Sequence, residues 1–507
     1  MNFIDYTIDK YREDLDTFGL RKVWEEIIEF RKKYTVIPSL LHTDNLGSLY
    51  EHGLAYIDKN NKKEQGVYYT PSDVAKVLSD YLVKLNGENV CDVCCGVGNL
   101  ILAYLRKIGA EKSEELLKNG YLYLYDKDEL AIDICKCRIG LYCGFEYIDR
   151  INVVVGDFLD KSIHLPENSK VISNPPYYKI TDMSENWEIS DIMKDNKEFY
   201  SAFIEKIMKE SKSSVLITPF SFIGGDKFYS LREFMNDYNG FILSFDNIPG
   251  NIFKGRKEGV FNSNLANSVR AAILVVENKE NVKGFRVSPL IRFSAEERDR
   301  LLKSSILYDL VGSEYQIISK TNKKYYKCFG DLIELYKDWV DYSDGLFADI
   351  LSKKETEYCL DMPKTCRYFV SATKKNLDRS GKTQLYFKDL ESFEFAYCLL
   401  NSSFAYWYWR LYDGGITYPD KLLKSIPIFY NKLSSNYKKE VHILATEIMA
   451  NEEKYLVYKK NANEMQENVK FPVEYRNRLN ELFLRVLNSS CKTQVFNKIH
   501  SNAIFGH

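Results

Sequence analysis

Long apolar runs are missing from this sequence: no stretch approaches the roughly 20 consecutive apolar residues that a membrane-crossing helix needs. Internal repeats and low-complexity tracts are missing too, which excludes solenoid architectures. Histidine is scarce, at 6 of 507 residues. Cys91, Cys94 and Cys95 lie close together, but no second Cys or His pair follows at the spacing of a zinc site. We therefore expect neither a membrane association nor a metal centre.

The features of a secreted, disulfide-rich protein are also missing. The eleven cysteines are scattered along the chain, and the N-terminus is acidic and does not resemble a secretory signal. We expect reduced thiols and a cytoplasmic location. Apolar residues make up 45% and charged residues 28%, which is typical of a folded globular protein. A chain of this length predicts about two to four structural units.

The net charge is only −1, which taken alone argues against a strongly basic nucleic-acid-binding protein. The charges are unevenly distributed, however. Residues 1–280 carry a net charge of −8, whereas residues 281–507 carry +7. This asymmetry favours a second half that faces a polyanion, behind a first half with another task.

Four segments of the chain differ in their residue pattern. Residues 1–62 are charged and helix-prone, whereas residues 63–282 alternate β-rich runs with helical patterns, as in a parallel sheet covered by helices. Residues 283–434 are irregular and aromatic-rich, and residues 435–507 hold two amphipathic stretches that predict a helical hairpin. We expect an α/β domain, then an α+β domain, with helical termini. The expected strands cover 90–93, 121–125, 151–155, 170–173, 215–218, 241–245 and 271–276.

Glycines and acidic residues follow three of the expected strands at their carboxyl ends. The first strand runs into Asp92-Val-Cys-Cys-Gly96-Val-Gly98-Asn99, where glycines let backbone N–H groups approach a ligand beside a helix N-terminus. The second ends at Asp126, where doubly wound folds place an acid that accepts both ribose hydroxyls. The third ends at Gly156-Asp157-Phe158, which offers a carboxylate for an adenine amino group and a ring to pack on the base. Singly these residues would more often be turn residues or helix caps, but together they predict a nucleoside ligand.

The most specific motif is Asn174-Pro175-Pro176-Tyr177-Tyr178, which follows the fourth apolar strand. Two prolines fix φ and exclude a helix, so this turn is expected to be rigid. The Asn174 amide oxygen and the Pro175 carbonyl would be two fixed acceptors for both hydrogens of an exocyclic amino group, which directs the nitrogen lone pair toward an electrophile. Tyr177 would stack on the ring that carries this amino group.

In these motifs and in their order the chain resembles the γ-class N6-adenine DNA methyltransferases, which use S-adenosylmethionine. That class has a further cofactor motif ahead of the first strand, and Gly66-Val-Tyr-Tyr-Thr70-Pro71 matches it, with Thr70 as an N-cap and Pro71 at the first helical position. The resemblance implies a doubly wound, mostly parallel Rossmann-like methyltransferase sheet followed by a target-recognition domain. The implied segments are a helical extension over 1–62, the catalytic domain over 63–282, the target-recognition domain over 283–434 and a helical hairpin over 435–507.

The resemblance also implies roles for single residues. S-adenosylmethionine would be bound by Thr70, Pro71, Asp92, Gly96, Gly98, Asp126, Asp157 and Phe158. The target adenine would be held by Asn174, Pro175 and Tyr177, with Tyr178 beside them. An aromatic residue after the sixth strand, either Phe253 or Phe261, would close the far face of the base. DNA would be contacted by basic residues interleaved with aromatic ones, namely Lys323, Lys324, Lys374 and Arg379.

The implied activity is site-specific methylation of adenine N6 in double-stranded DNA, with the target base flipped out of the duplex. The expected enzyme is a monomer, acting alone or beside a separately encoded restriction endonuclease. A fused nuclease is not expected, because residues 1–65 contain no Asp/Glu-x-Lys and are too short for such a domain. Three alternatives stay open: an RNA methyltransferase, a protein-glutamine methyltransferase, and a non-catalytic DNA-binding specificity subunit.

Overall fold

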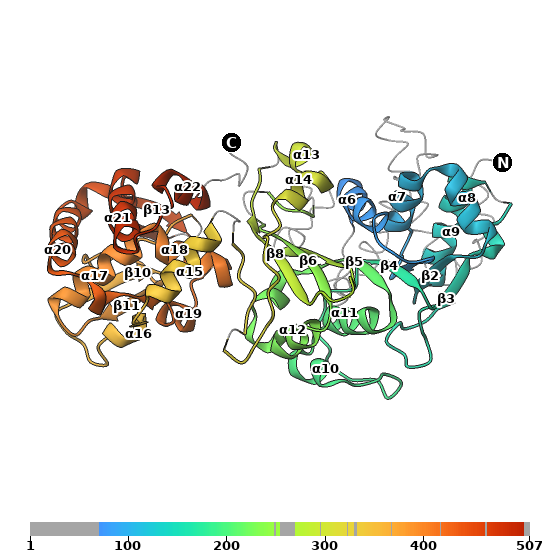
Figure 1. The fold of residues 1–507 in the computed structure, drawn as a ribbon, viewed down its shortest axis with the longest axis horizontal. Helices are drawn as coiled ribbons and strands as arrows, with labels where there is room; N and C mark the ends of the chain where they lie inside the picture. Colours follow the sequence, from blue (N-terminus) through green and yellow to red (C-terminus); the bar gives the residue numbers. More distant parts are fainter. Residues whose placement is uncertain are drawn as a thin grey trace. The chain divides into compact units, whose positions relative to one another are not determined.

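The computed structural model describes residues 70–500, except 145, 248–249, 254–268, 295, 322, 329–331, 367, 416 and 462–463. The described chain divides into two compact units (Figure 1). Unit 1 extends to Val287 and includes Phe293–Tyr325, and unit 2 comprises Ser288–Arg292 and the chain from Tyr326 onward. The expected helical extension over 1–62, most of the leading cofactor motif and Phe261 lie outside the described residues.

Unit 1 is built on one sheet of eight strands in the order β3-β2-β1-β4-β5-β7-β6-β8. The strands from β3 to β5 run parallel, and β7 lies antiparallel between β5 and β6. The expected α/β fold with a mostly parallel sheet is confirmed, and all seven expected strands are present. The strands are β1 Asn89–Val93, β2 Leu122–Asp126, β3 Asn152–Val155, β4 Ser169–Ser173, β5 Ser213–Pro219, β6 Asn239–Phe245, β7 Ala271–Val276 and β8 Gly284–Ile291.

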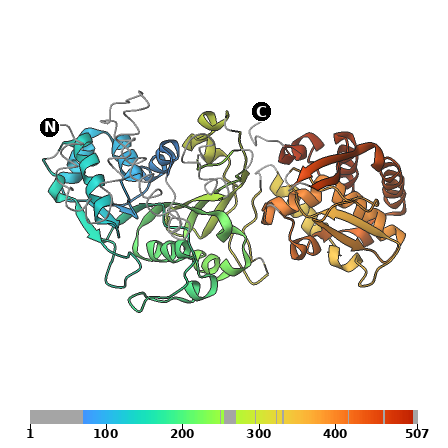
Figure 2. The same cartoon turned by 180° about the vertical axis from the view of Figure 1, so that it is seen from behind.

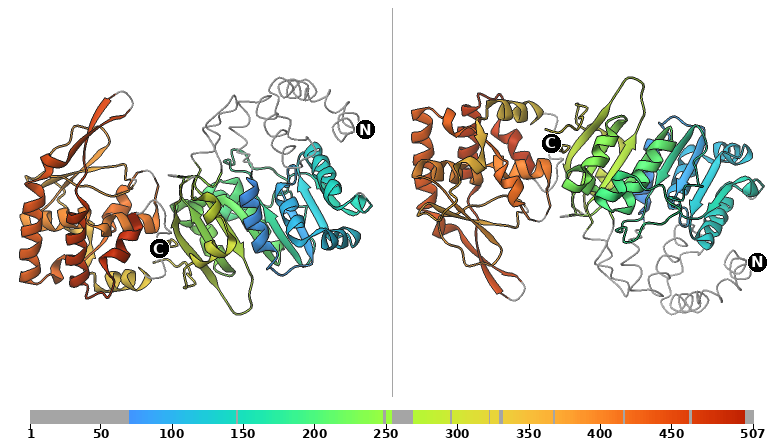
Figure 3. Two further views of the ribbon diagram at one scale, coloured as in Figure 1. Left: turned by 90° about the horizontal axis from the view of Figure 1, so that it is seen from above. Right: turned by 90° about the horizontal axis from the view of Figure 1, so that it is seen from below.

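Helices cover both faces of this sheet (Figures 1 and 3). α6 and α7 pack together on one face, while α11 and α12 lie on the other, where the α11 side chains share a hydrophobic core with β1, β4 and β5. Figure 2 shows both layers from behind. The helices are α6 Ser72–Leu82, α7 Asn99–Ile108, α8 Ala110–Lys118, α9 Glu129–Cys143, α10 Asp191–Asn196, α11 Phe199–Glu210, α12 Tyr229–Met235, α13 Arg298–Leu301 and α14 Ser304–Asp309, with 3-10 turns at Ile148–Arg150, Phe220–Ile223 and Asp226–Phe228.

The strand order reverses between β1 and β4. From β1 the chain continues to β2 and β3 on one side and then crosses back to β4, which pairs with β1 through Asp92↔Ile172 and Val93↔Ser173. The two connections leave in opposite directions, so a crevice opens beyond the carboxyl ends of these strands, where open sheets bind ligands. The glycine turn after β1 and Asn174 after β4 are therefore neighbours, although about 80 residues separate them in sequence.

The structure differs from the sequence-based expectation at residue 283. β8 is the last strand of the eight-stranded sheet, its first half up to Val287 is grouped with unit 1, and unit 1 includes the chain from Phe293 to Tyr325. Phe285 and Val287 of β8 are buried in the core that α11 also lines. Ser288 and Pro289 interrupt the β-rich pattern of this strand, which explains why the sequence alone did not reveal it. The assignment of a function to each segment stays a prediction.

Unit 2 has a large hydrophobic core around α17 and α18, and it includes the aromatic cluster from Phe404 to Trp409. Its strands form two-stranded antiparallel pairs, β10 Cys359–Pro363 with β11 Lys382–Tyr386, β9 Gly345–Leu346 with β12 Pro427–Ile428, and β13 Leu456–Asn461 with β14 Glu464–Val469. Its helices are α15 Ile333–Tyr342, α16 Phe347–Ile350, α17 Leu390–Asn401, α18 Ser403–Tyr412, α19 Asp420–Lys424, α20 Ser435–Met449, α21 Val473–Val486 and α22 Thr493–Asn497, with 3-10 turns at Tyr430–Lys432, Glu452–Tyr455 and Lys498–His500.

The two amphipathic stretches near the C-terminus are helices, α20 and α21, but they do not form a separate hairpin. The β13–β14 pair lies between them in sequence, and both helices pack on α17. Their apolar faces, including Leu444 and Phe483, are buried in the common core of unit 2. The segment 435–507 is therefore part of the same compact unit as the preceding chain.

No helix in the described part of the chain is long and apolar enough to cross a membrane. Among the same residues no group of three or more His, Cys, Asp and Glu side chains is arranged to hold a metal ion. The cysteines whose side chains the structure describes are all free.

Candidate active site

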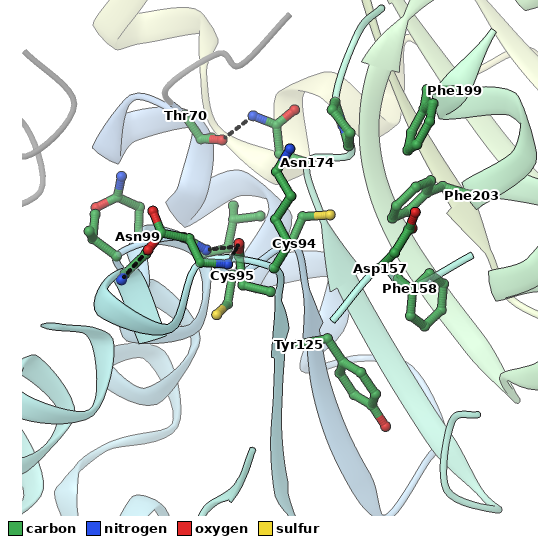
Figure 4. A pocket seen from close by; sticks show the side chains of 18 of the residues that line it. Thr70, Cys94, Cys95, Asn99, Tyr125, Asp157, Phe158, Asn174, Phe199 and Phe203 are labelled. Atoms are coloured by element: carbon green, nitrogen blue, oxygen red, sulfur yellow. Dashed lines mark hydrogen bonds between the residues drawn. The ribbon is translucent and has the colours of Figure 1, made fainter. Parts of the chain in front are cut away.

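A cavity of about 260 Å³ lies in unit 1, where loops after β1, β2, β3 and β4 meet. Figure 4 shows the rings of Phe158, Phe199 and Phe203 gathered on one side of it, with Asn99 and Cys95 on another. The cavity therefore combines an apolar wall with a polar, backbone-rich wall, as a nucleoside requires. Its lining residues are Thr70, Cys94, Cys95, Gly96, Val97, Asn99, Leu100, Tyr125, Asp126, Lys127, Asp128, Ala131, Gly156, Asp157, Phe158, Asn174, Pro176, Tyr178, Phe199 and Phe203.

The glycine turn after β1 needs left-handed backbone at several positions. Cys94, Gly96 and Gly98 have φ values of 59°, 49° and 85°. A Cβ atom on Gly98 would lie 2.4 Å from the Cys135 sulfur of α9, so only glycine allows α9 to pack this closely against the turn. A Cβ on Gly96 would meet nothing within 4 Å, because Gly96 faces the open cavity. The first glycine therefore keeps space for a ligand, and the second keeps the turn in contact with α9.

Asp126, at the end of β2, ties this turn to the next strand. Its Oδ2 accepts a hydrogen bond from the Gly96 backbone N–H at 2.8 Å, and its Oδ1 accepts one from the Asp128 N–H at 3.0 Å. Burial raises the pKa of Asp126, although these backbone hydrogen bonds act in the opposite direction. Because Asp126 also lines the cavity, its carboxylate is held in a fixed position beside any ligand.

Arg138 of α9 supports the turn from behind and was missed by sequence reasoning. This buried guanidinium donates hydrogen bonds to the Val97 carbonyl and, at 3.0 Å, to Asn99 Oδ1. Val97 and Asn99 both line the cavity. Nothing in the local sequence marks Arg138, because its partners lie about 40 residues earlier in the chain.

Asp92 does not line the cavity. It is fully buried, and its Oδ2 accepts a hydrogen bond from the Ile101 N–H of α7 at 3.1 Å. Its Oδ1 has no hydrogen-bond partner among the residues that the structure describes. Burial raises the pKa of Asp92 well above the ordinary carboxyl value, against the opposing effect of the Ile101 hydrogen bond. Asp92 thus anchors the start of α7 and supports the glycine turn indirectly.

Replacing Asp92 with asparagine is expected to stabilise the protein increasingly as the pH rises. A carboxyl with a raised folded-state pKa binds its proton more tightly when folded, so its favourable contribution is lost as the pH rises from the unfolded value toward the folded one. Asparagine keeps the shape and does not titrate. The difference in unfolding free energy between variant and wild type should be smallest near about pH 4 and should grow toward neutral pH in denaturant titrations. A difference that does not change with pH would show that Asp92 has an ordinary pKa.

Asp157 and Phe158 after β3 form another side of the cavity. The Phe158 ring packs on Tyr125 and Phe203, with ring centroids 5.7 and 5.3 Å away. The Asp157 Oδ1 accepts a hydrogen bond from the Leu159 N–H at 3.0 Å, and its Oδ2 accepts one from the Trp187 indole N–H at 2.9 Å. The carboxylate is therefore oriented on both sides by groups that sequence analysis did not single out.

Asn174 stands at the centre of a hydrogen-bond chain at the end of β4. Its Nδ2 donates to Thr70 Oγ1 at 2.9 Å (Figure 4). Its Oδ1 accepts from the Tyr177 hydroxyl at 2.7 Å. The Tyr177 hydroxyl also lies 2.9 Å from the Ile217 carbonyl of β5. An amide oxygen accepts two hydrogen bonds, so the Tyr177 contact is compatible with a substrate amino group at Oδ1. Thr70 and Tyr177 together fix the plane of the Asn174 amide.

The aromatic residues near Asn174 are placed in two groups. The Tyr177 ring makes edge contacts with Tyr200 and with the buried Phe253, at centroid distances of 6.4 and 6.1 Å. The Tyr178 ring stacks on Phe199 at 4.2 Å and lines the cavity. Phe253 is thus the described candidate for the far wall of a base pocket.

Several expected site residues do not line the cavity. Pro71, not Thr70, is the N-cap of α6, so the expected start of this helix is wrong by one residue. Gly98 contacts α9, and Pro175 is buried in the turn after β4. Lys324 forms an ion pair with Asp226 at 2.8 Å in unit 1, and the Lys323 ammonium lies over the Tyr229 ring. In unit 2 the Lys374 backbone N–H donates to Glu452, and Arg379 donates to Asn468. The roles expected for these residues stay predictions.

Some residues that line the cavity were not predicted from the sequence, among them Asp128, Phe199 and Phe203. Asp128 could have been identified from the sequence, because it follows Asp126 closely and precedes a helical pattern. In the structure it is the N-cap of α9, and its carboxylate accepts a hydrogen bond from the Ala131 N–H. Phe199 and Phe203 lie four residues apart on α11, so they share one face of this helix. Their place beside the cavity depends on how α11 packs on the sheet, which the sequence does not state.

Comparisons with known proteins show what the chain is similar to. The type II methyltransferase M.VspI of Vibrio sp. strain 343 is 27% identical over 231 residues, which is 44% of this chain and 50% of the relative. M.BsuBI of Bacillus subtilis, also a type II methyltransferase, is 27% identical over 193 residues, 34% of this chain and 37% of the relative. The solved ATP-dependent Type ISP restriction-modification enzyme LlaBIII bound to DNA is 11% identical, with a TM-score of 0.44 and coverage of 91% of this chain and 48% of that one.

The chain spans half or less of the length of each of these proteins. The sequence pattern of the N-6 DNA Methylase family matches residues 41–301, which is just over half of the 507 residues. The matched part contains the glycine turn, Asp126, Asp157 and the Asn174 motif, and the expected membership of the N6-adenine DNA methyltransferases is thereby confirmed, while the γ class stays a prediction. The chain belongs to the N-6 DNA Methylase family.

Proposed function

We propose that the protein transfers a methyl group from S-adenosylmethionine to the N6 amino group of a flipped adenine in double-stranded DNA. The observation that carries this proposal is the position of Asn174, whose amide plane is fixed by Thr70 and Tyr177 at the edge of a nucleoside-sized cavity. Membership of the N-6 DNA Methylase family supports the same substrate. The motif order, with the cofactor turn ahead of the Asn174 motif, supports the γ class.

The cavity fits S-adenosylmethionine in its donors, its acceptors and its apolar wall. Gly96 leaves open space where a side chain would fill the ligand site. Asp126 offers a fixed carboxylate for ribose hydroxyls, and Phe158 offers an aromatic face beside the Asp157 carboxylate for adenine. Thr70, which precedes the N-cap of α6 and is hydrogen-bonded to Asn174, would lie near the methionine carboxylate, as the family resemblance implies. The bound cofactor supplies a methyl group already activated on a sulfonium.

The residues of the chain then need to hold and orient the acceptor. Asn174 Oδ1 and the Pro175 carbonyl accept the two N6 hydrogens, which draws the nitrogen lone pair out of conjugation and toward the methyl carbon. Formation of the N–C bond would break the S–C bond and leave the thioether product, and the proton that the nitrogen loses would pass to solvent. The hydrogen bonds described for the Asn174 side chain come from an amide, a threonine and a tyrosine, none of them a strong base, so we assign catalysis to alignment and charge stabilisation. Closure by Phe253 on the far side of the base would exclude water.

The second unit would supply the contacts to DNA. Unit 2 carries a net charge of +4, from 27 basic and 23 acidic residues, and Lys374 and Arg379 lie in it. We assign DNA recognition to it, with base-edge contacts giving sequence selectivity. The protein would act as a monomer, either alone or beside a separate restriction endonuclease.

A transfer assay with labelled S-adenosylmethionine and three acceptors tests the proposal. The purified protein should label duplex DNA from a methylation-free host in its adenines, and should leave RNA and bulk protein unlabelled. Labelling of RNA or of glutamine side chains would instead identify one of the alternative amino-methyltransferases. Binding of DNA without any transfer would favour a non-catalytic specificity subunit.

A further inference from the structure

Arg298 of α13 is a buried arginine that connects two distant segments of unit 1. Only 4% of its surface is exposed. Its Nε and Nη2 donate to both carboxylate oxygens of Asp73, at 2.6 and 3.0 Å, which makes a bidentate ion pair. Its Nη1 and Nη2 also donate to the backbone carbonyls of Asn251 and Ile252, at 2.6 and 2.7 Å. One guanidinium therefore holds four acceptors from two segments of chain.

The ion pair with Asp73 connects Arg298 to the segment that contacts the amide nitrogen of Asn174. Asp73 lies in the first turn of α6, directly after the segment that presents Thr70. Thr70 Oγ1 accepts the hydrogen bond from Asn174 Nδ2 at 2.9 Å. Because only Pro71 and Ser72 separate Thr70 from Asp73, and proline fixes its own φ, a shift of Asp73 moves Thr70 and with it the donor side of the Asn174 amide.

The hydrogen bonds to the Asn251 and Ile252 carbonyls connect Arg298 to the residues that contact the amide oxygen of Asn174 through Phe253 and Tyr177. These carbonyls directly precede Phe253, whose backbone N–H donates to Asn251 Oδ1 at 2.8 Å. The Phe253 ring lies 6.1 Å from the Tyr177 ring, and the Tyr177 hydroxyl donates to Asn174 Oδ1 at 2.7 Å. The same arginine thus fixes the loop that carries the candidate far wall of the base pocket.

We infer that Arg298 is a positioning residue for methyl transfer, which fixes the spacing between the α6 turn beside Asn174 and the Phe253 loop. This inference rests on the proposed function, because it assigns the two segments to the two sides of the target adenine. A guanidinium suits the task because its planar fork bonds a carboxylate and has donors left for carbonyls in fixed directions. Lysine keeps the charge but loses this geometry.

The test compares the Arg298→Lys variant with wild type in a single-turnover assay at saturating DNA and S-adenosylmethionine. The rate is expressed per cofactor-binding site, so loss of folded protein does not enter it. Misplacement of the reacting groups by the order of an ångström is expected to lower this rate by about tenfold or more, while the dissociation constant for S-adenosylmethionine stays within about threefold of wild type. Arg286→Lys is the matched control, because Arg286 contacts Tyr308 and neither of the two segments.

A per-site rate within about twofold of wild type for Arg298→Lys would overturn the inference and leave a purely structural ion pair. If Arg298→Lys does not accumulate as folded protein, the Asp73→Asn variant is measured in its place and judged by the same per-site rate. This substitution weakens only the ion pair between Arg298 and α6 and leaves the hydrogen bonds to Asn251 and Ile252. Adenine methylation by the wild type is measured first. Its absence would contradict the proposed function, whereas its presence with unaffected variants would contradict only the role of Arg298.

Discussion

Replacing Asn174 with alanine is expected to lower the rate of methyl transfer by about 10³-fold or more, since it removes the acceptor that orients the N6 amino group in the transition state. Cofactor binding should largely survive, because the glycine turn, Asp126 and Asp157 are held by their own hydrogen bonds. Single-turnover rates and equilibrium binding of S-adenosylmethionine measure the two effects separately.

The structure also suggests a matched control for this variant. The Asn174 amide nitrogen donates a hydrogen bond to the Thr70 hydroxyl. Thr70→Val removes this hydroxyl, which fixes the amide, but leaves the Asn174 side chain intact. Its rate should fall between those of wild type and Asn174→Ala. Retained activity of Asn174→Ala, or loss of folding in place of loss of rate, would count against the assignment of Asn174.

Replacing Gly98 with alanine is expected to lower the free energy of unfolding by about 3 kcal/mol, which combines the cost of left-handed backbone with that of overpacking. The new Cβ would lie 2.4 Å from the Cys135 sulfur and at a backbone φ of 85°. Either the turn or α9 must move, so the cavity should be distorted as well. Denaturant titration measures the stability, and cofactor titration measures the cavity.

Two further variants separate the causes of this effect. Gly96→Ala introduces a left-handed alanine without any clash, so it should cost less stability and should act mainly by narrowing the ligand site. Adding Cys135→Ala to Gly98→Ala removes the closest atom and should restore part of the lost stability. If Gly98→Ala unfolds at the same denaturant concentration as wild type, the close packing of α9 against the turn is not required.

Much of unit 1 could be predicted because its signals are local. Each strand end that borders the cavity carries its own marker, such as the glycines after β1, Asp126 after β2 and the prolines after β4. The parallel arrangement then follows from the alternation of strands and helices, since such sheets bring the carboxyl ends of their strands to one edge. The doubly wound order of β1 and β4 was expected from the family resemblance and not from the alternation alone.

The features that escaped prediction depend on contacts between distant residues. Trp187 orients Asp157 from 30 residues away, and Arg298 pairs with Asp73 across 225 residues. Neither contact has a local pattern. Unit 2 was outlined only as aromatic-rich sequence with two terminal helices, because its short strands pair without a repeating rhythm. The core around α17 and α18 brings together residues that are far apart in sequence, so it could not be predicted from local patterns.

The most direct test of the central claim is a map of modified adenines in the genome of a methylation-free host that expresses this protein. Long-read sequencing should find N6-methyladenine at one defined sequence motif in cells with the wild-type chain, and none in cells with Asn174→Ala at the same soluble level. No modified motif in cells that contain soluble wild-type protein would contradict the account.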